Sequence, residues 1–447
     1  MTLPVVAEYN ERMARGDAAA LGEELLDKMR QAGLTFGDRL VCSVLRPHFI
    51  RGEDYRRVVQ AGALILGALE RLSDAVMQDA ALRELVGLTQ DEQAIIGIDP
   101  GFRYADSSGR LDAFFVPSES LSFIEYNAES PGGLAFGEVL SDLFRAFPIM
   151  AEITQRHPVV TFPIRSWILD TLLDTYREWG GRSRPNIAIV DWREVRTFNE
   201  FLLIQRTFEA AGYPTRIVDP RDLEYDGSRL CVDGFKIDLV YKRVVTSELL
   251  NREGLQSPLV RAVADRAVCM VNAFRAHLLL KKALFAFLSD PQYEHLYTAA
   301  QRAAIAAHIP WTRRVAEGYT EWCGQQVDLL PHAVARREHL VLKPSGEYGG
   351  QGVVLGWETP PAEWEAALRQ ATQAVYVLQE RVPVPQEDFP SLEDGQIHFS
   401  PRFLDLDPYT WQGTSARGCG VRLSGSALLN VSAGGGSAVP MFVVGDA

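Results

Sequence analysis

Two strand-like segments carry closely spaced acidic and amide side chains. Glu125 and Asn127 lie two residues apart in LSFIEYNAESPGG (121–133), so on a strand they share one face. Asp112 lies in GRLDAFF (109–115), and pairing of the two segments as a hairpin would bring the three side chains together. Two carboxylates and an amide oxygen suit Mg²⁺, a hard cation that completes its shell with water and phosphate oxygens. The alternative is a solvated strand face, because acidic side chains are mostly exposed.

A glycine-rich loop is the second candidate. In VLKPSGEYGGQGVVLG, Lys343 ends a predicted strand and a cluster of glycines follows it: Gly346, Gly349, Gly350 and Gly352. Such glycines let backbone N–H groups approach a phosphate closely. The spacing is not GxxxxGK[ST], and the loop leads into a strand rather than a helix, so no helix dipole assists. A hairpin with a glycine-rich turn is the alternative.

Weaker signals lie in three other segments. In AVYVLQERVPVP, Gln379 and Glu380 end an apolar strand, where their hydrogen-bonding groups could orient a flat heterocycle. Lys281 and Lys282 in LLLKKALFAFL could bind an anion, but helix lysines more often face solvent. Arg422 in RGCGVRLSG could contact a phosphate or be an ordinary surface arginine.

Composition excludes several function classes. The 447 residues include 58 acidic and 45 basic ones, so the net charge is −13 and gives no footprint for a nucleic-acid backbone. A phosphate-bearing small molecule can still bind, because local cations focus a positive site. The five cysteines are isolated, which indicates neither a zinc site nor a disulfide framework. GxSxG, HExxH and EF-hand motifs are missing from the sequence, so it does not support covalent catalysis by a serine elbow.

The apolar stretches are short. The longest, 61–69, is far below the ~20 residues that span a bilayer. Charged residues from Glu8 onward argue against a signal peptide. We therefore expect a cytoplasmic protein with neither a membrane nor a nucleic-acid partner.

These candidate residues need elements to position them. Residues 1–90 have helical periodicity, and three short β-rich runs between 95 and 133 predict an antiparallel meander. From residue 185 the order strand, helix, strand predicts a small parallel α/β unit, whose first turn lacks GxGxxG and so disfavours dinucleotide binding. Residues 255–320 are predicted to be mainly helical, and the last third to be β-rich.

Taken in chain order, these motifs resemble those of the circularly permuted ATP-grasp proteins. They are similar in particular to the synthetase domain of glutathionylspermidine synthetase and its uncharacterised bacterial relatives. The order GRLDAFF, LSFIEYNAESPGG, KKALFAFL, VLKPSGEYGGQGV and VLQERVPVP carries the resemblance, together with the tail LLNVSAGGGSAVPMFVV. In ordinary ATP-grasp enzymes the lysine and glycine loop precede the metal-binding E-x-N, whereas here they follow it. The resemblance covers about residues 95–447.

The resemblance implies roles for single residues. Arg110 would steady the transferring phosphoryl group or an acyl phosphate. Magnesium bridging the ATP phosphates would be held by Asp112, Glu125 and Asn127. ATP itself would be contacted by Lys282, Lys343, Gly349 and Gly350, with Gln379, Glu380, Arg381 and Val382 framing the adenine. Gln351 stands where many relatives have a second basic residue, and Lys281 is not distinguishable from Lys282.

The resemblance further implies an α/β fold with α+β elements, of circularly permuted ATP-grasp type. The expected regions are a helical N-terminal region (1–90), the metal-binding half of the core with helices (91–184), a small parallel α/β unit (185–254), helices with the ATP-binding subdomain (255–390) and a C-terminal β-rich part (391–447). No amidase domain is expected.

The implied activity is that of an ATP-dependent carboxylate–amine ligase. It would form an amide through an acyl phosphate, with ATP and Mg²⁺ as cofactors and a small-molecule carboxylate and amine as substrates. Two alternatives stay open: a small-molecule kinase on the same fold, and a non-catalytic nucleotide-binding module.

Overall fold

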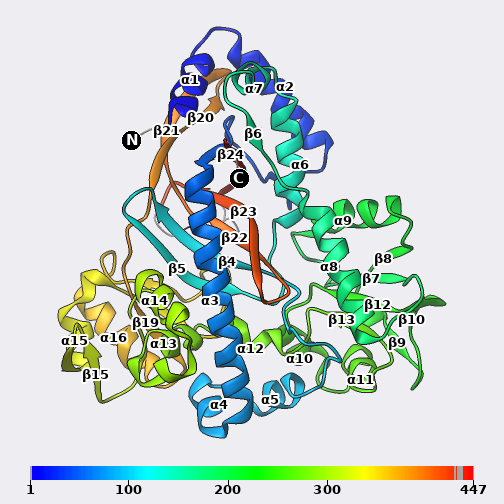
Figure 1. Cartoon of the computed structure of the whole chain (residues 1–447), viewed down its shortest axis with the longest axis vertical. Helices are drawn as coiled ribbons and strands as arrows, with labels where there is room; N and C mark the ends of the chain where they lie inside the picture. Colours follow the sequence, from blue (N-terminus) through cyan, green and yellow to red (C-terminus); the bar gives the residue numbers. More distant parts are fainter. Residues whose placement is uncertain (1–2, 427–428, 430–435, 446–447) are drawn as a thin grey trace.

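The chain folds around three sheets that converge on one cavity. The computed structural model describes residues 3–426, 429 and 436–445. Figure 1 shows the largest sheet in the upper half, with a second sheet at the lower right and a third at the lower left. The expected C-terminal region and tail motif include residues 427–428, 430–435 and 446–447, which lie outside the described residues. Among the residues described, no helix has the length and apolar character that a bilayer crossing requires.

The largest sheet is mostly antiparallel and carries the E-x-N segment at its edge. Its strands run in the order β20 (Gln386–Glu393), β21 (Gln396–Leu404), β23 (Ser415–Ser424), β22 (Asp407–Trp411), β4 (Ser108–Val116), β5 (Ser120–Asn127). β24 (Ser437–Val444) pairs with β23 and also with the short strands β3 (His48–Arg51) and β6 (Val159–Val160). The N-terminal region is therefore not purely helical, since β3 adds a parallel strand to β24.

Two differences from the expected β-elements have local causes. The segment 95–133 forms two strands rather than three, because GIDPGFRYADS (97–107) is rich in turn residues and forms no strand. The expected boundary at residue 391 falls inside β20, which tolerates Pro390 because β20 is an edge strand of the sheet.

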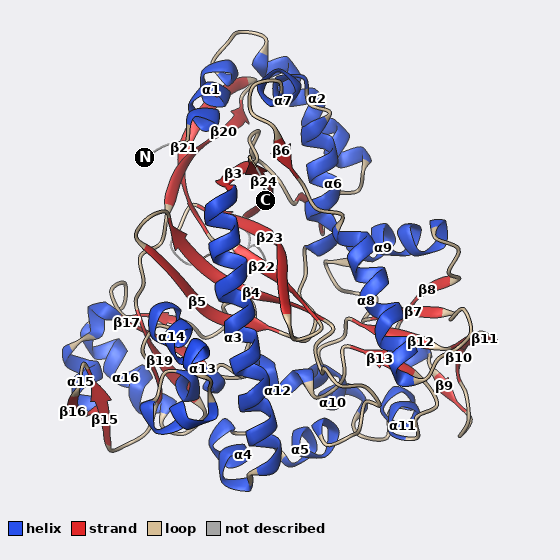
Figure 2. Cartoon of the chain, in the orientation of Figure 1, coloured by secondary structure: helices blue, strands red, loops and turns tan. Residues whose placement is uncertain are grey.

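Helices cover this sheet on both sides. The long helix α3 (Gly52–Gln78) lies across it and contacts β22 and β23 (Figure 2). The other N-terminal helices are α1 (Pro4–Met13), α2 (Ala18–Gln31), α4 (Ala80–Val86) and α5 (Gln90–Ile96), with a hairpin of β1 (Thr35–Phe36) and β2 (Arg39–Leu40) between α2 and β3. The helices after β5 are α6 (Leu134–Arg145), α7 (Pro148–Thr154) and α8 (Ile164–Trp179).

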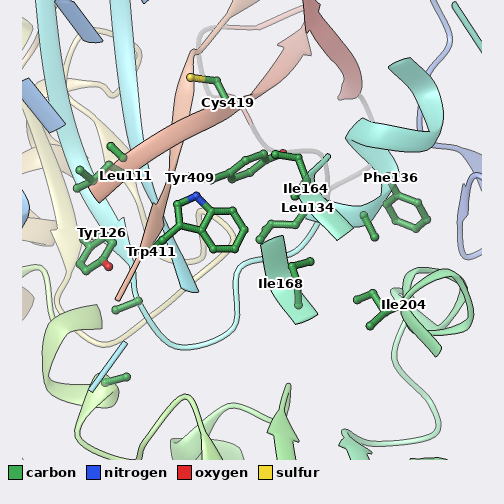
Figure 3. Close-up of a cluster of buried hydrophobic side chains, with 14 of the residues drawn as sticks. Leu111, Tyr126, Leu134, Phe136, Ile164, Ile168, Ile204, Tyr409, Trp411 and Cys419 are labelled. Atoms are coloured by element: carbon green, nitrogen blue, oxygen red, sulfur yellow. The ribbon is translucent and has the colours of Figure 1, made fainter. Parts of the chain in front are cut away.

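The hydrophobic core joins this sheet to the helices that follow β5. Figure 3 shows Tyr409 and Trp411 of β22 beside Leu134 of α6 and Ile164 of α8, all of them buried. The Trp411 ring also meets the Trp167 ring edge-on, with centroids 5.8 Å apart. This packing fixes β22 against α6 and α8, and Tyr409 also lines the cavity described below.

The second sheet is the predicted parallel α/β unit. Its order is β13 (Cys269–Val271), β12 (Leu239–Lys242), β7 (Ile187–Val190), β8 (Thr215–Val218), and its three pairings are parallel. α9 (Phe198–Ala210), α10 (Thr246–Glu253) and α11 (Pro258–Ala264) accompany it, with a small sheet of β9 (Glu224–Tyr225), β10 (Leu230–Val232) and β11 (Phe235–Ile237). The unit extends past the expected boundary at residue 254, because it includes strand β13. The sequence does not predict β13, since this strand has three residues and lies in a stretch whose pattern is otherwise helical.

The third sheet is antiparallel and carries the glycine loop. Its order is β14 (Thr312–Arg314), β19 (Tyr376–Glu380), β17 (Leu340–Pro344), β18 (Val354–Leu355), with the loop joining β17 to β18. The hairpin β15 (Tyr319–Trp322) and β16 (Gln325–Asp328) lies beside it with α15 (Leu329–Ala335) and α16 (Pro361–Ala371). α12 (Ala276–Leu280), α13 (Ala283–Leu288) and α14 (Ala299–His308) lead into it.

Candidate active site

One cavity of about 690 Å³ lies between the three sheets. Arg110 and Glu125 line it from the large sheet, Lys343 and Gln379 from the antiparallel sheet, and Asp191 from the end of the parallel sheet. Its volume is within the range of small-ligand sites. The residues predicted from the sequence that line it are Arg110, Glu125, Asn127, Lys282, Lys343, Gly349, Gly350, Gln379, Glu380, Arg381, Val382 and Arg422.

A bulge in the β4–β5 hairpin aims the E-x-N side chains at the cavity. Asp112 pairs with Glu125 but Ala113 pairs with Phe123, so Ile124 is an extra residue in β5. Phe123 therefore faces α3, whereas Glu125 faces the cavity, although the two are two residues apart. Without the bulge, the two-residue period would place both side chains on one face.

Glu125 is surrounded by cations. Lys282 Nζ lies 3.1 Å from its Oε2, and Lys343 and Arg422 are near enough to act on it electrostatically. Burial alone would raise the pKa of Glu125, but these three cations hold it well below its ordinary value. The carboxylate is thus ionised at neutral pH and available to a cation.

Lys343 is held rigidly at the end of β17. It is buried, and its Nζ donates a hydrogen bond to Gln379 Oε1 at 2.6 Å. Burial lowers the pKa of Lys343 to about 8, although the charge of Glu125 opposes this. The ammonium is therefore still mostly protonated at neutral pH and can neutralise an anion in the cavity.

Gln379 supports Lys343, whereas the resemblance assigns it to adenine. Its carboxamide oxygen accepts from Lys343, and its Nε2 donates to Thr312 Oγ1 at 3.1 Å and to the Ile124 carbonyl at 3.3 Å. The N–H of Arg381 likewise donates to the His339 carbonyl at 2.8 Å. The N–H of Glu380 donates to the Trp311 carbonyl at 2.8 Å, so the Glu380 side chain and Val382 are the cavity-lining groups of that set without a described hydrogen bond.

The two adjacent lysines are separated by the turn after α12. Lys282 faces the cavity, where its Nζ donates to the Glu347 carbonyl at 2.7 Å. Lys281 instead donates to Glu92 Oε1 of α5, also at 2.7 Å. Successive residues of a turn point in different directions, and here only Lys282 is among the cavity-lining residues.

The glycine loop lies over the cavity and is fastened at its tip. Tyr348 donates a hydrogen bond from its hydroxyl to Glu248 of α10, and Lys282 holds the carbonyl of Glu347. Gly349, Gly350 and Gly352 have φ between +63° and +75°, a conformation that glycine adopts without strain. The positive φ values explain why glycines occur at these positions.

Asp112 is engaged by two arginines. It is fully buried; its Oδ1 accepts from Arg110 Nε at 2.6 Å, and its Oδ2 from Arg422 Nη2 at 2.6 Å. Arg422 also pairs with Asp405 at 2.5 Å and with Asp407 at 3.0 Å. A metal ion at Asp112 would therefore have to share its oxygens with two guanidinium groups.

Asp405 and Asp407 are cavity residues that the sequence reasoning missed. Both are buried and line the cavity, and Asp407 Oδ2 lies 3.0 Å from Arg422 Nε and 3.5 Å from Arg110 Nε. Burial and the neighbouring carboxylates raise the pKa of Asp407, against the effect of Arg422 and Arg110. The signal that could have found them is the acidic pair in LDLDP (404–408), where β21 ends and β22 begins.

The oxygen donors in this wall fit a hard divalent cation. Glu125 and Asn127 line the cavity, and so does Asp407, whose Oδ2 is ion-paired with Arg422. In the described residues, no group of three or more His, Cys, Asp or Glu side chains forms a metal cluster. A cation here would use few protein ligands and take the others from water and phosphates, as Mg²⁺ does.

The end of the cavity that the parallel sheet forms lies at the carboxyl ends of β7 and β12. The chain passes from β7 to β8 on one side and then crosses to β12 on the other, which makes a topological switch point. In open parallel sheets, ligands bind at such a point. Asp191 and Arg243 follow the two strands directly, and both line the cavity.

Asp191 and Arg243 are also absent from the sequence prediction. Asp191 is 9% exposed, and burial raises its pKa to about 7, with the Trp192 N–H at 2.8 Å opposing this shift. Arg243 is buried; its Nη2 donates to the Pro131 carbonyl at 2.6 Å, and its Nε lacks a partner among the residues described. Their sequence signal is a polar residue directly after a buried parallel strand.

Comparison with known proteins supports a ligase relationship. No family model matches the chain. The chain is 28% identical to a putative glutamate–cysteine ligase 2-2 of Frankia casuarinae over 255 residues, which are 54% of this chain and 27% of that protein. It is 28% identical to a putative glutamate–cysteine ligase 2-3 of Frankia alni over 214 residues, 45% of this chain and 23% of that protein. The aligned region thus spans about a quarter of these curated relatives.

The fold is shared with a solved protein. A glutathione synthetase-like effector from Globodera pallida, in its apo form, superposes with a TM-score of 0.60 over 95% of this chain and 96% of that one, at 13% identity. The chain is therefore a mixed α/β protein with a glutathione synthetase-like fold, related in sequence to proteins named as ligases. Circular permutation and the likeness to glutathionylspermidine synthetase stay predictions.

Proposed function

We propose that the protein is an ATP-dependent ligase that joins a carboxylate to an amine through an acyl phosphate. The observation that carries this proposal is the single cavity in which Lys282, Lys343 and Arg422 face the Glu125–Asn127 pair beneath the glycine loop. We also propose the permuted ATP-grasp arrangement, because β5 precedes β17 and the loop in the chain.

The nucleotide would bind with its phosphates between Lys282 and Lys343 and its base toward Glu380 and Val382. The loop carrying Tyr348 would cover the phosphates and exclude water. Glu125 and Asn127, with Asp112 or Asp407, would hold Mg²⁺, which when bound neutralises phosphate charge. These groups position and neutralise reactants, which is the main requirement of phosphoryl transfer.

In the first step, an oxygen of the substrate carboxylate attacks the γ-phosphorus, and the bond to the β–γ bridging oxygen breaks, so that ADP leaves. Arg110 and Arg422 would hold the carboxylate and the acyl phosphate formed from it. In the second step, the amine nitrogen attacks the acyl carbon and inorganic phosphate leaves, while the nitrogen gives up a proton. We place the amine at the Asp191 end, where a buried carboxylate could bind an ammonium group and accept that proton.

The test is a reaction of purified protein with ATP, Mg²⁺ and panels of carboxylates and amines. A ligase releases ADP and phosphate in quantity only when both substrates are present, and hydroxylamine in place of the amine gives a hydroxamate. A kinase instead yields a stable phosphorylated product without an amine, and a non-catalytic module binds ATP without turnover. Either of these two results overturns the proposal.

Glu125→Gln supplies the matched variant. It keeps the size of the side chain and removes the charge that faces Lys282. We expect turnover to fall by about 10²–10³-fold while the far-UV spectrum stays unchanged. Lys28→Met, at an exposed position of α2 that does not line the cavity, is the control and should keep full turnover.

A further inference from the structure

A chain of buried charged groups leads from the wall of the cavity, which Glu129 lines, into the interior of the protein. We call Glu92, Glu129, Lys242, His277 and Lys281 the buried ion chain. His277 lies at its centre and is fully buried: its Nε2 is 2.7 Å from Glu92 Oε1, and its Nδ1 is 3.1 Å from Glu129 Oε2. An imidazole with a carboxylate at each nitrogen donates on both sides only when it is protonated.

Each end of the buried ion chain is fixed to a different element. Glu92 Oε1 also accepts from Lys281, and its Oε2 caps α5 by accepting from the Thr89 N–H at 2.8 Å. Glu129 Oε1 accepts from Lys242 Nζ at 2.6 Å and from the Thr246 N–H at 2.7 Å. The chain of contacts thus joins α5, the end of β5, the end of β12 and α12.

Two of these elements carry cavity residues a short distance along the backbone. Lys281 precedes Lys282, whose N–H donates to the Ser345 carbonyl at the start of the glycine loop, at 3.0 Å. Glu129 follows Asn127 by two residues, on the segment that leaves β5. His277 therefore connects the turn that carries one cation of the cavity to the strand that carries its oxygen donors.

Stability alone does not account for such a network. Burying ionised groups carries a desolvation penalty that their mutual attraction often only offsets, and apolar replacements are commonly as stable. What the contacts do provide is a fixed distance between elements, because each charged group can be satisfied in one arrangement only. Supporting residues of this kind hold the groups that touch a ligand in position.

We propose that His277 is a positioning residue of the nucleotide site, which holds Lys282 against the β5 residues Glu125 and Asn127. The proposal rests on the proposed function in so far as the cavity binds a nucleotide. His277 itself does not line the cavity and would act through Lys282.

The test measures binding of a non-hydrolysable ATP analogue with Mg²⁺ by calorimetry, in a double-mutant cycle of His277→Gln and Lys282→Met. We expect His277→Gln to weaken binding about tenfold in the wild-type background and less than about twofold when Lys282 is already methionine. In steady-state assays the KM for ATP should rise, while the KM for the amine stays constant. His308→Gln, which removes a hydrogen bond to the Leu121 carbonyl outside the cavity, is the matched control and should bind normally.

Equal effects of His277→Gln in both backgrounds would show a merely structural role and overturn the proposal, as would unchanged binding. If His277→Gln does not fold, Glu92→Gln replaces it, because glutamine keeps the capping of α5 and removes the charge facing His277. We then expect Glu92→Gln to weaken binding of the ATP analogue in the wild-type background and to have little effect when Lys282 is methionine. A wild-type protein that binds the analogue but joins no substrates overturns the ligase proposal alone, and one that binds no nucleotide overturns both.

Discussion

The two ends of the cavity are built differently. At the proposed nucleotide end, Lys343, Lys282 and Glu125 are each tied to a partner within the protein. At the parallel-sheet end, Asp191 and Arg243 stand at the strand termini, and each keeps part of its polar side chain unused by the described residues. The contrast indicates that the end with Lys343 is preorganised for one ligand. At the end with Asp191 and Arg243, the charges of these side chains would be balanced by groups of the molecule that binds there.

The largest expected effect tests the preorganised end. Lys343→Met removes the buried ammonium and leaves the carboxamide oxygen of Gln379 without this donor. We expect kcat/KM for ATP to fall about 10³-fold, because a preorganised charge opposite the phosphates is lost. Turnover at saturating amine, with Lys28→Met as the control, measures it. A loss below about fivefold would show that this end is not preorganised around Lys343.

An intermediate effect tests the parallel-sheet end. Asp191→Asn keeps the size of the side chain and removes its charge, so the KM for the amine should rise about ten- to a hundredfold while the KM for ATP stays constant. Parallel initial-rate series against each substrate measure the split. A change in the KM for ATP alone would show that Asp191 contacts the nucleotide, and the contrast between the two ends would disappear.

The same substitution should change the pH dependence of stability. The pKa of Asp191 is about 7 in the folded protein, above its ordinary value of 3.8, so the folded state binds the extra proton between these pH values. Unfolding free energy of the wild type therefore falls as pH rises from about 4 to about 7. In Asp191→Asn this decrease of the unfolding free energy does not occur. The melting temperature of the variant should therefore exceed that of the wild type by more at pH 8 than at pH 4. An equal difference at both pH values would contradict the assignment.

The smallest expected effect concerns the loop that covers the nucleotide end. Tyr348→Phe removes the hydroxyl that bonds Glu248 and should raise the KM for ATP about threefold to tenfold, because one hydrogen bond to a charged group closes the loop. Tyr319→Phe, at a tyrosine that is 73% exposed, is the control. Limited proteolysis with and without ATP should show faster cleavage near residue 348 in the variant. Unchanged cleavage would mean that Glu248 does not fasten the loop.

Local sequence patterns were sufficient for much of the nucleotide end. The two-residue spacing of Glu125 and Asn127 placed them on one face, and Lys343 before four glycines predicted a strand followed by a loop. The pattern did not reveal the extra residue Ile124, because a bulge is defined by the partner strand. It also did not reveal that Gln379 accepts a hydrogen bond from Lys343.

The sequence by itself determined which residue types could bind a magnesium nucleotide, and which strands and helices carry them, since both depend on neighbours a few positions away. Only the tertiary structure decided that Asp112 meets Arg422 across 310 positions, that Lys281 turns to Glu92, and that Asp191 and Arg243 share the cavity. These pairings follow from the order in which strands are placed in the sheets. Strand order is set by packing of distant segments, which no local spacing records.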